Sequence, residues 1–293
     1  MLPAMPAPEN LPLERLNTLP RETFVAALKD VFEHAPWVAE IAAGARPFPT
    51  VAALHDAMMT ALRATPPAQQ LEFIRGHPEL GSKLARADLT EESQSEQGRL
   101  GLDRLSGEEF SRFQRLNAAY RDKFGFPFIV CVRRHTRDSI LRQFERRLAN
   151  DIESERKTAI DEIALIARLR LVAKVDGPGK PKTDGRLSTH VLDIARGRPV
   201  QGVRIALYEI GASARGLLRE AVTNAGGRTD APLIAGEPLR IGTYDLQFFV
   251  GDYFGDNSFF DTVPVRFSIA EPEGHYHVPL LVTPWSYATY KGS

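Results

Sequence analysis

The stretch Asp176-Gly-Pro-Gly-Lys-Pro-Lys-Thr-Asp-Gly185 divides the sequence into two parts with different residue patterns. It holds two prolines and three glycines and lacks large apolar side chains, a composition typical of a linker. The chain has 293 residues, enough for two domains at roughly 100–200 residues each. We therefore predict a domain over residues 1–175, a linker over 176–185 and a second domain over 186–293.

Apolar residues before the linker recur with the period of an α-helix. The pattern is clear from Phe24 to Phe32, and again from Val51 to Leu62, where Thr50 is placed to cap the helix. A long last helix is expected from about Glu153 to Lys174. The first domain is therefore predicted to be all-α.

After the linker the apolar period changes from 3.6 residues to 2. Alternation runs through 203–208, 244–250 and 263–269, and turns rich in glycine and proline separate these segments. Short alternating strands with such turns favour an antiparallel sandwich. The fold class predicted from the sequence is thus an all-α domain followed by an all-β sandwich.

Charge and composition exclude several classes of protein. The chain has 37 Lys and Arg against 37 Asp and Glu, so it lacks the basic surplus of a general binder of nucleic acid or anionic membranes. One cysteine, Cys131, excludes an internal disulfide and a multi-cysteine metal site. With no secretory signal pattern and no apolar run of about 18 residues, we expect a cytoplasmic protein without membrane partners.

Three segments of the helical half offer polar groups for catalysis. His77 follows Gly76 and precedes Pro78, so it is expected at a stiff corner after a helix. Glu96 lies in a polar stretch, and residues 124–132 form an apolar extended segment. Together they could build an acid–base pocket. The alternative is that His77 only ends its helix and Glu96 is solvated.

Arg170 is unusual because it shares the apolar face of the last helix with Ile163 and Ala167. Buried arginines are rare unless they are paired. Either its stem packs while its head reaches water, or its guanidinium anchors an anionic substrate group. The residues alone leave both interpretations open.

The helical half resembles a known enzyme family. The motifs His77-Pro-Glu-Leu80, Ser93-Gln-Ser-Glu-Gln97, Tyr120-Arg-Asp-Lys-Phe-Gly-Phe-Pro-Phe128 and Leu169-Arg-Leu171 occur in this order. They resemble the 2-oxo-4-hydroxy-4-carboxy-5-ureidoimidazoline (OHCU) decarboxylases, over roughly Leu16 to Val175. The resemblance implies an all-helical enzyme without a cofactor. Glu79 departs from the aspartate more frequent in the family, which should not affect the chemistry.

The same resemblance assigns roles to residues of the helical half. It implies that His77 is the catalytic acid or base, that Glu96 is its carboxylate partner and that Arg170 holds an anionic part of the substrate. The remaining expected pocket residues are Pro78, Ser93, Gln97, Phe128, Ile129, Val130, Cys131 and Val132.

Histidines mark both ends of the strand half. Residues two apart on a strand share a face, so His275 and His277 should point away from the core side of Tyr276. With His190 they could bind zinc, act as general acid and base, or be surface histidines. Arg228 follows a glycine turn, where it could reach a substrate or be solvated.

The strand half resembles the 5-hydroxyisourate hydrolases, the enzymatic branch of the transthyretin family. The resemblance covers about Arg186 to Ser293 and rests on four motifs: Leu187-Ser-Thr-His-Val-Leu-Asp193, Gly227-Arg-Thr-Asp230, His275-Tyr-His-Val-Pro-Leu-Leu281 and Tyr290-Lys-Gly-Ser293. It implies a transthyretin-like sandwich without a metal.

Residue roles follow from this second resemblance as well. It implies that His190, Arg228 and His277 form the catalytic group, with His275, Tyr290 and Ser293 near the substrate. The family usually has arginine where this chain has Lys291, so the bidentate fork of that position is lost.

The two families catalyse consecutive steps of urate degradation within purine metabolism. We therefore predict a bifunctional enzyme that hydrolyses 5-hydroxyisourate to OHCU and decarboxylates OHCU to S-allantoin, without cofactors. A homo-oligomer is expected, a tetramer through the transthyretin-like domain. The alternative is a small-ligand binding module, as in the carrier branch of the family, fused to a decarboxylase.

Overall fold

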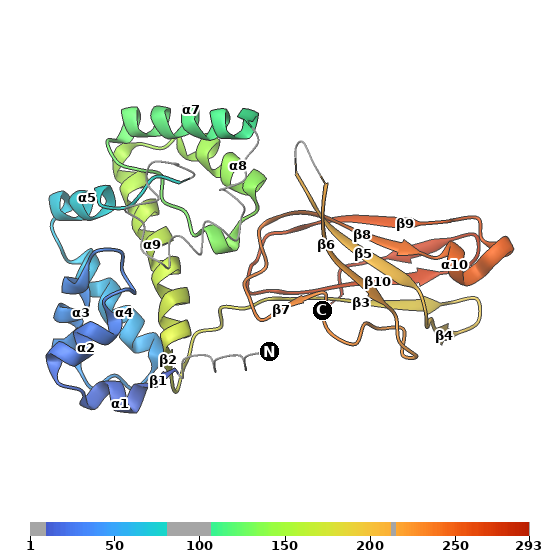
Figure 1. Ribbon diagram of the computed structural model, residues 1–293, viewed down its shortest axis with the longest axis horizontal. Coiled ribbons are helices and arrows are strands. Elements are labelled where there is room, and N and C mark those ends of the chain that lie inside the picture. The colour runs from blue at the N-terminus through green and yellow to red at the C-terminus, as the bar shows by residue number, and fades with distance from the viewer. Residues whose placement is uncertain (1–9, 81–106, 212–214, 293) are drawn as a thin grey trace, which may run out of the picture. The chain divides into compact units, whose positions relative to one another are not determined.

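The computed structural model describes residues 10–80, 107–211 and 215–292. Two compact units make up this part of the chain (Figure 1). One unit includes the chain up to Val132 together with Leu141–Lys182, and the other includes Arg133–Ile140 together with the chain from Thr183. The passage from Lys182 to Thr183 lies inside the predicted linker. The segment 133–140 is grouped with the second unit although it precedes the linker in the sequence.

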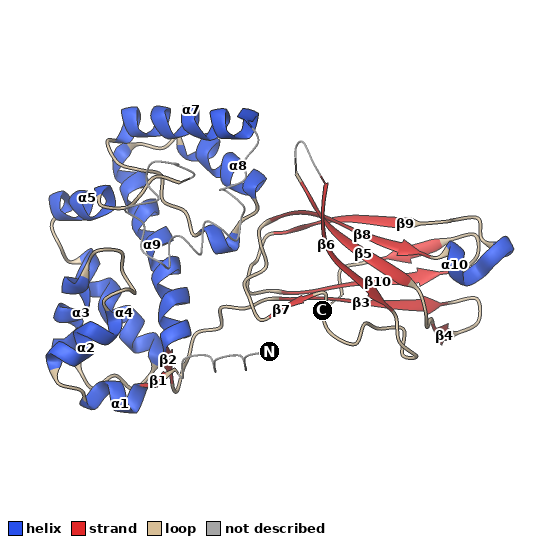
Figure 2. Ribbon diagram, in the orientation of Figure 1, coloured by secondary structure: helices blue, strands red, loops and turns tan. Residues whose placement is uncertain are grey.

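The first unit is helical, as predicted (Figure 2). Its main helices are α1 (Leu13–Thr18), α2 (Arg21–Leu28), α3 (Pro36–Ala42), α4 (Val51–Arg63), α5 (Pro67–Arg75), α7 (Gly107–Phe124), α8 (Arg137–Arg147, whose first residues group with the second unit) and α9 (Ile152–Lys174). Two short strands, β1 (Leu11–Pro12) and β2 (Val175–Asp176), pair in parallel. Among the described residues, no helix is long and apolar enough to cross a membrane.

Capping residues set the starts of two helices in this unit. The Thr50 hydroxyl accepts a hydrogen bond from the amide of Ala53, which confirms the predicted cap of α4. Asp151 caps α9 in the same way through the amide of Ser154. The sequence Ser106-Gly-Glu-Glu109 also predicts a capping box before α7, but Ser106 lies outside the described residues.

The predicted linker makes defined contacts with the helical unit. The carbonyls of Pro178 and Gly179 accept hydrogen bonds from the amides of Val51 and Ala52, at 2.9 and 3.3 Å. Gly179 has a φ of 59°, and a Cβ there would lie 2.7 Å from the Cβ of Thr50. The first half of the linker is therefore ordered against the start of α4, which composition alone does not indicate.

The second unit contains two sheets, and its all-β nature is also as predicted (Figure 2). In one sheet the strands lie in the order β11 (Tyr287–Thr289), β10 (His275–Val282), β3 (Arg186–Asp193) and β4 (Arg198–Pro199). The short strand β7 (Ile234–Ala235) also pairs with β3. In the other sheet the order is β6 (Arg215–Val222), β5 (Arg204–Ile210), β8 (Gly242–Phe249) and β9 (Val263–Ile269). A short helix, α10 (Gly251–Phe254), follows β8.

The pairing of β3 with β10 is parallel, whereas the other pairings within the two sheets are antiparallel. The first and one of the last strands of the unit therefore run side by side. In this register His277 lies opposite Ser188, and Pro279 lies opposite His190. The alternating pattern favours an antiparallel sandwich and does not indicate this one parallel pairing, which brings the histidines of the two strands together.

The core of the second unit is formed by alternate residues of the strands. Leu187 and Val191 of β3 are buried, as are Tyr276, Val278 and Leu280 of β10. The prediction that Tyr276, Val278 and Leu280 form the core side of their strand is confirmed. His275 and His277 consequently occupy the opposite face of the same sheet.

Candidate active sites

His77 lies directly beyond the end of α5. Gly76 caps that helix in a right-handed conformation, with φ of −70°. Nδ1 of His77 lies 3.1 Å from the carbonyl oxygen of Phe73, and the ring packs edge-on against Phe73. A carbonyl can only accept, so Nδ1 carries the hydrogen and Nε2 of the neutral ring keeps its lone pair.

One pocket of the helical unit joins His77 to Glu33 and Arg170, although they come from three separate segments. Its lining residues are Val31, Phe32, Glu33, His77, Pro78, Leu80, Phe128, Ile129, Val130, Val132, Ile163, Ile166 and Arg170. The predicted pocket residues Phe128, Ile129, Val130, Val132 and Pro78 are thus brought together with His77 and Arg170. Cys131 is not among them, and Glu96, Ser93 and Gln97 lie outside the described residues.

Glu33 is a pocket residue that the sequence patterns did not single out. Its carboxylate lies 2.8 Å from Nη1 of Arg170, and both side chains are almost fully buried. The guanidinium also contacts the carbonyl of Asp30 at 3.4 Å. Arg170 is therefore a buried, paired arginine, and the interpretation that its head reaches water is wrong.

The surroundings of His77 favour its neutral form. Burial lowers the pKa of His77 to about 4, and the charge of Arg170 acts in the same direction. The Phe73 carbonyl and the Glu33 carboxylate oppose this shift of the pKa without reversing it. At neutral pH the pocket therefore presents an uncharged imidazole beside a buried ion pair.

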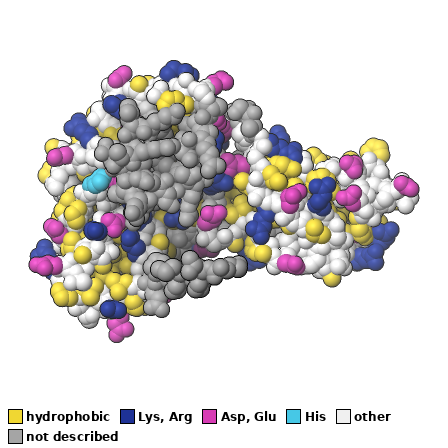
Figure 3. Space-filling view, in the orientation of Figure 1, with side chains coloured by type: hydrophobic (Ala, Val, Ile, Leu, Met, Phe, Trp, Pro, Cys, Tyr) yellow, Lys and Arg dark blue, Asp and Glu magenta, His cyan; other side chains and the backbone are white. Residues whose placement is uncertain are grey.

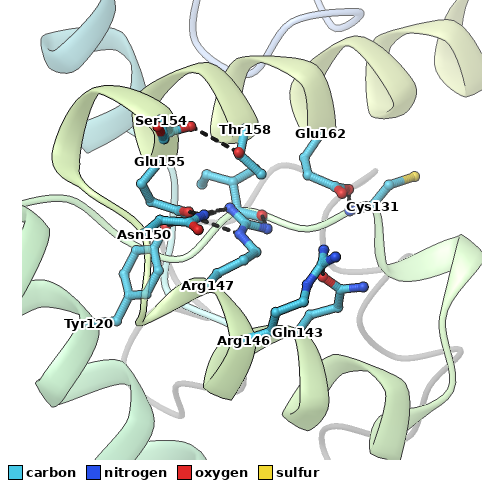
Figure 4. A network of polar contacts seen from close by, with 11 residues as sticks. Tyr120, Cys131, Gln143, Arg146, Arg147, Asn150, Ser154, Glu155, Thr158 and Glu162 are labelled. Carbon is cyan, nitrogen blue, oxygen red and sulfur yellow. Dashed lines mark hydrogen bonds and ion pairs between the residues drawn. The ribbon is translucent and has the colours of Figure 1, made fainter.

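A second buried network holds the apolar segment that lines the pocket (Figure 4). Arg147 of α8 donates to the carbonyl of Ile129 at 2.7 Å and forms an ion pair with Glu155 of α9 at 2.6 Å. Tyr120 donates a short hydrogen bond to Glu155, and the amide of Cys131 donates to Glu162 at 2.7 Å. These contacts fix the main chain on both sides of Val130.

The second site lies on the β3–β10 face of the strand unit. His190 projects from β3, and its Nε2 is buried with no hydrogen-bond partner among the described atoms. Arg228 lies in the turn that pairs with β3 at His190. Burial, followed by the charge of Arg228, lowers the pKa of His190, while a hydrogen bond with the main chain of Gly226 opposes the shift.

Glycine is required at the turn that brings Arg228 to His190. Gly227 has a φ of 72°, and a Cβ there would lie 2.4 Å from the carbonyl oxygen of Val191 and 3.1 Å from Cδ2 of His190. The amide of Val191 donates to the carbonyl of Gly227 at 2.8 Å. The turn therefore packs directly on β3 beside the imidazole.

His277 occupies β10 beside His190 and Arg228. Burial lowers the pKa of His277, and the charges of Arg228, His190, His275 and Arg186 lower it further. Gly292 donates its amide to the carbonyl of His277 at 2.8 Å, so the last described residues lie along the same strand. The structure therefore brings His190, Arg228 and His277 together on one face of the sheet.

Ser188 is the residue of this site that sequence reasoning missed. Its hydroxyl lies 3.0 Å from Nδ1 of His277 and 3.1 Å from Nε2 of His275. A usable signal was present, because Ser188 stands two residues before His190 and so shares its face of the strand.

The remaining predicted residues of the second site are less closely joined to it. Tyr290 is 58% exposed, and no described contact joins it to His190, His275 or His277. Ser293 lies outside the described residues. Lys291, which replaces the usual arginine, places Nζ 4.9 Å from the ring centre of Tyr276. Among the described residues, no group of three or more His, Cys, Asp or Glu side chains is arranged to hold a metal ion.

Comparisons with known proteins match a different family on each side of the linker. A sequence model of the OHCU decarboxylase family matches residues 17–172, and a model of the HIUase/Transthyretin family matches residues 187–292. A Haloferax volcanii protein named 2-oxo-4-hydroxy-4-carboxy-5-ureidoimidazoline decarboxylase is 41% identical over 164 residues, which are 56% of this chain and 96% of the relative.

Two further similarities concern the second half and the whole chain. A Deinococcus radiodurans protein named 5-hydroxyisourate hydrolase is 53% identical over 113 residues, 36% of this chain and 95% of the relative. A crystal structure titled (S)-allantoin synthase is 33% identical, covers 97% of this chain and 100% of its own, and has a TM-score of 0.51. The chain therefore belongs to the OHCU decarboxylase family in residues 17–172 and to the HIUase/transthyretin family in residues 187–292.

Proposed function

We propose that this chain is a bifunctional enzyme of urate degradation that forms S-allantoin from 5-hydroxyisourate. The strand unit hydrolyses 5-hydroxyisourate to OHCU, and the helical unit decarboxylates OHCU. The observation that carries this proposal is that one chain holds both sites: one imidazole lies in a pocket with an arginine in the helical unit, and two imidazoles lie near an arginine in the strand unit. The similarity to (S)-allantoin synthase, which covers 97% of this chain, supports a bifunctional enzyme with both units in one chain.

For decarboxylation, the pocket around His77 supplies orientation and a proton carrier. Loss of CO2 leaves an electron pair that the conjugated imidazoline ring can accept, and protonation on one face of a ring carbon completes the reaction. We assign the proton transfer to Nε2 of His77, which keeps its lone pair because Nδ1 donates to Phe73. The neutral ring expected at pH 7 supports a role as base before it acts as acid.

Arg170 is assigned to an anionic group of OHCU. A guanidinium carries five N–H donors, so pairing through Nη1 with Glu33 is compatible with a further contact to the substrate. Glu33 also holds the guanidinium in one orientation and balances its charge inside the apolar pocket. The assignment of Glu96 as partner of His77 stays a prediction from the family resemblance.

For hydrolysis, the site must deprotonate water, stabilise an oxyanion and protonate the leaving nitrogen. His190 and His277 both have lowered pKa values, which favours the neutral, basic form of each ring. The unpartnered Nε2 of His190 supports a role in binding the attacking water or the substrate. Arg228 supplies the positive charge for the developing oxyanion.

The assembly proposed for the chain is a homo-oligomer. Members of the transthyretin family suggest a tetramer through the strand unit, and we adopt this state together with a cytoplasmic location as proposals. Basic and acidic side chains are both spread over the face of the molecule in Figure 3. This distribution, with equal numbers of basic and acidic residues, supports small-molecule substrates rather than nucleic acid.

The decisive experiment starts from urate and urate oxidase, which generate 5-hydroxyisourate in the cuvette. Addition of the purified chain should speed both the loss of 5-hydroxyisourate and the rise of optically active allantoin. Acceleration of neither step over the spontaneous reaction would refute the proposal. Acceleration of decarboxylation alone would support the alternative, in which the strand unit only binds a small ligand.

A further inference from the structure

Three side chains on the β3–β10 face form one continuous hydrogen-bonded row. His277 and Ser188 are cross-strand neighbours in the parallel register, and His275 lies one step along the same face. The Ser188 hydroxyl joins Nδ1 of His277, at 3.0 Å, to Nε2 of His275, at 3.1 Å. His277 is partly buried, whereas His275 is exposed.

The row has two hydrogen-bond arrangements because a serine hydroxyl has one hydrogen and can accept another. In the first, His275 donates from Nε2 to Ser188, and Ser188 donates to Nδ1 of His277. Neutral His277 then carries its hydrogen on Nε2. In the second, both bonds are reversed, and Nε2 of His277 holds a lone pair.

The two arrangements correspond to the two tasks of an imidazole in hydrolysis. With the lone pair on Nε2, His277 can accept the proton of the attacking water. With the hydrogen on Nε2, it can protonate the leaving nitrogen. Reversal of the row therefore converts His277 between base and acid.

We propose that His277, Ser188 and His275 form a proton relay that resets His277 and connects the hydrolase site to solvent. The relay rests on the proposed hydrolase function and adds two positioning residues, Ser188 and His275, to it. When Nε2 of His277 takes a proton from water, the Nδ1 proton passes to Ser188, whose own proton passes to Nε2 of His275. His275, charged by this transfer, releases a proton from Nδ1 to solvent. When Nε2 of His277 then protonates the leaving nitrogen, Ser188 passes its proton to Nδ1 of His277 and takes the proton from Nε2 of His275. His275 regains a proton from solvent at Nδ1, which restores the starting arrangement.

The proton balance of the reaction calls for such a path. Water adds to the ring carbonyl, the carbon–nitrogen bond breaks, and the nitrogen gains a proton. The carboxylic acid that forms ionises at neutral pH, so each turnover releases a proton. The groups whose charges act on His277 are Arg228, His190, His275 and Arg186. The two arginines remain charged at neutral pH, so of these groups only the histidines can pass this proton on.

The test compares hydrolysis by the full-length wild type with four variants. Ser188→Ala removes the bridging hydroxyl and Ser188→Thr keeps it. His275→Gln keeps a hydrogen-bonding group beside Ser188 but cannot carry a proton between two ring nitrogens. Thr189→Val is the matched control, because it removes a buried hydroxyl of the same strand that bonds Val278 on the other face.

The relay predicts that Ser188→Ala and His275→Gln lower the hydrolase kcat by about tenfold or more and change KM by less than about twofold. Ser188→Thr should restore most of the rate. Added imidazole should speed His275→Gln in proportion to its concentration and leave the wild type unchanged. Thr189→Val should keep the wild-type rate and pH profile.

Several results would overturn the relay. One is wild-type hydrolysis by Ser188→Ala or His275→Gln, and another is a slow His275→Gln that imidazole does not rescue. Decarboxylation of OHCU by the same preparations reports whether each variant chain remains active in its other unit. If the wild-type chain does not hydrolyse 5-hydroxyisourate, the proposed hydrolase function itself is refuted. If the wild type is active but the variants do not behave as predicted, the relay alone is refuted.

Discussion

Glu33 and Arg170 form a buried ion pair across 137 residues of sequence, with 2.8 Å between Oε2 and Nη1. Their side chains are 2% and 5% exposed. Both line the pocket that contains His77, and both act on its pKa. The pair therefore links the loop after α2 and helix α9 to the decarboxylase site.

Replacement of Glu33 tests this link directly. Glu33→Ala leaves the guanidinium of Arg170 without its carboxylate inside an apolar pocket, which should lower the free energy of unfolding by about 3–5 kcal/mol. Decarboxylation should fall while hydrolysis persists below the unfolding transition. The control is Asp161→Asn, which breaks the exposed pair with Arg63 and should cost about 1 kcal/mol or less. Equal urea midpoints for the two variants would contradict a buried pair.

The lowered pKa of His77 predicts the pH dependence of decarboxylation. A folded-state pKa of about 4 keeps the imidazole neutral from pH 8 to about pH 5. The kcat/KM should therefore be flat across this range and fall as the pH approaches the pKa and His77 becomes protonated. A fall in kcat/KM centred near pH 6.5 would show that His77 has its ordinary pKa and that burial does not lower this pKa.

Replacement of the two proposed catalytic histidines should separate the two activities. His77→Ala should reduce decarboxylation by about 10²- to 10⁴-fold and leave hydrolysis intact, because it removes the proposed proton carrier of one site only. His190→Ala should have the opposite effect. Both activities are measured from one preparation by following 5-hydroxyisourate and optically active allantoin. Loss of both in either variant would indicate that the two sites are coupled.

Much of this architecture could be predicted from local patterns. Helical periodicity located α9 to within about a residue at each end, and Thr50 was identified as the cap of α4. Alternation identified β9 over Val263–Ile269. These features depend on neighbours in sequence, which a period or a cap records.

Features that depend on distant contacts were missed. Glu33 lies between two helices in a segment without a motif, and only the folded chain places it beside Arg170. Ser188 shares a strand face with His190, but its contact with His277 depends on the parallel register of β3 with β10. Nothing in the alternation of either strand specifies which strand becomes its neighbour or in which direction.

Arg147 tests whether the buried network of Figure 4 supports the decarboxylase pocket. Arg147→Ala removes the partner of Glu155 and the donor to Ile129, so the unfolding free energy should fall by about 3–5 kcal/mol. The control is Arg146→Ala on the next residue, which loses only an exposed contact with Gln143 and should change stability by about 0.5 kcal/mol or less. Denaturant titration of the two variants measures the free energy of unfolding of the helical unit in each. Similar midpoints would mean that the network does not hold the segment.

Gly227 provides a test of how the hydrolase site is built. Gly227→Ala places a Cβ 2.4 Å from the carbonyl oxygen of Val191 at a φ of 72°, so the turn must move away from β3 and carry Arg228 with it. Gly197→Ala is the matched control, because Gly197 has a φ of 65° but a Cβ there meets nothing within 4 Å. Both variants bear the strain of a left-handed backbone, about 1–2 kcal/mol. Only Gly227→Ala should reduce hydrolysis, by about tenfold or more, because only there does the new side chain displace Arg228, the group proposed to stabilise the oxyanion. Equal hydrolysis rates in the two variants would contradict the prediction, because they would show that hydrolysis does not depend on the position of Arg228.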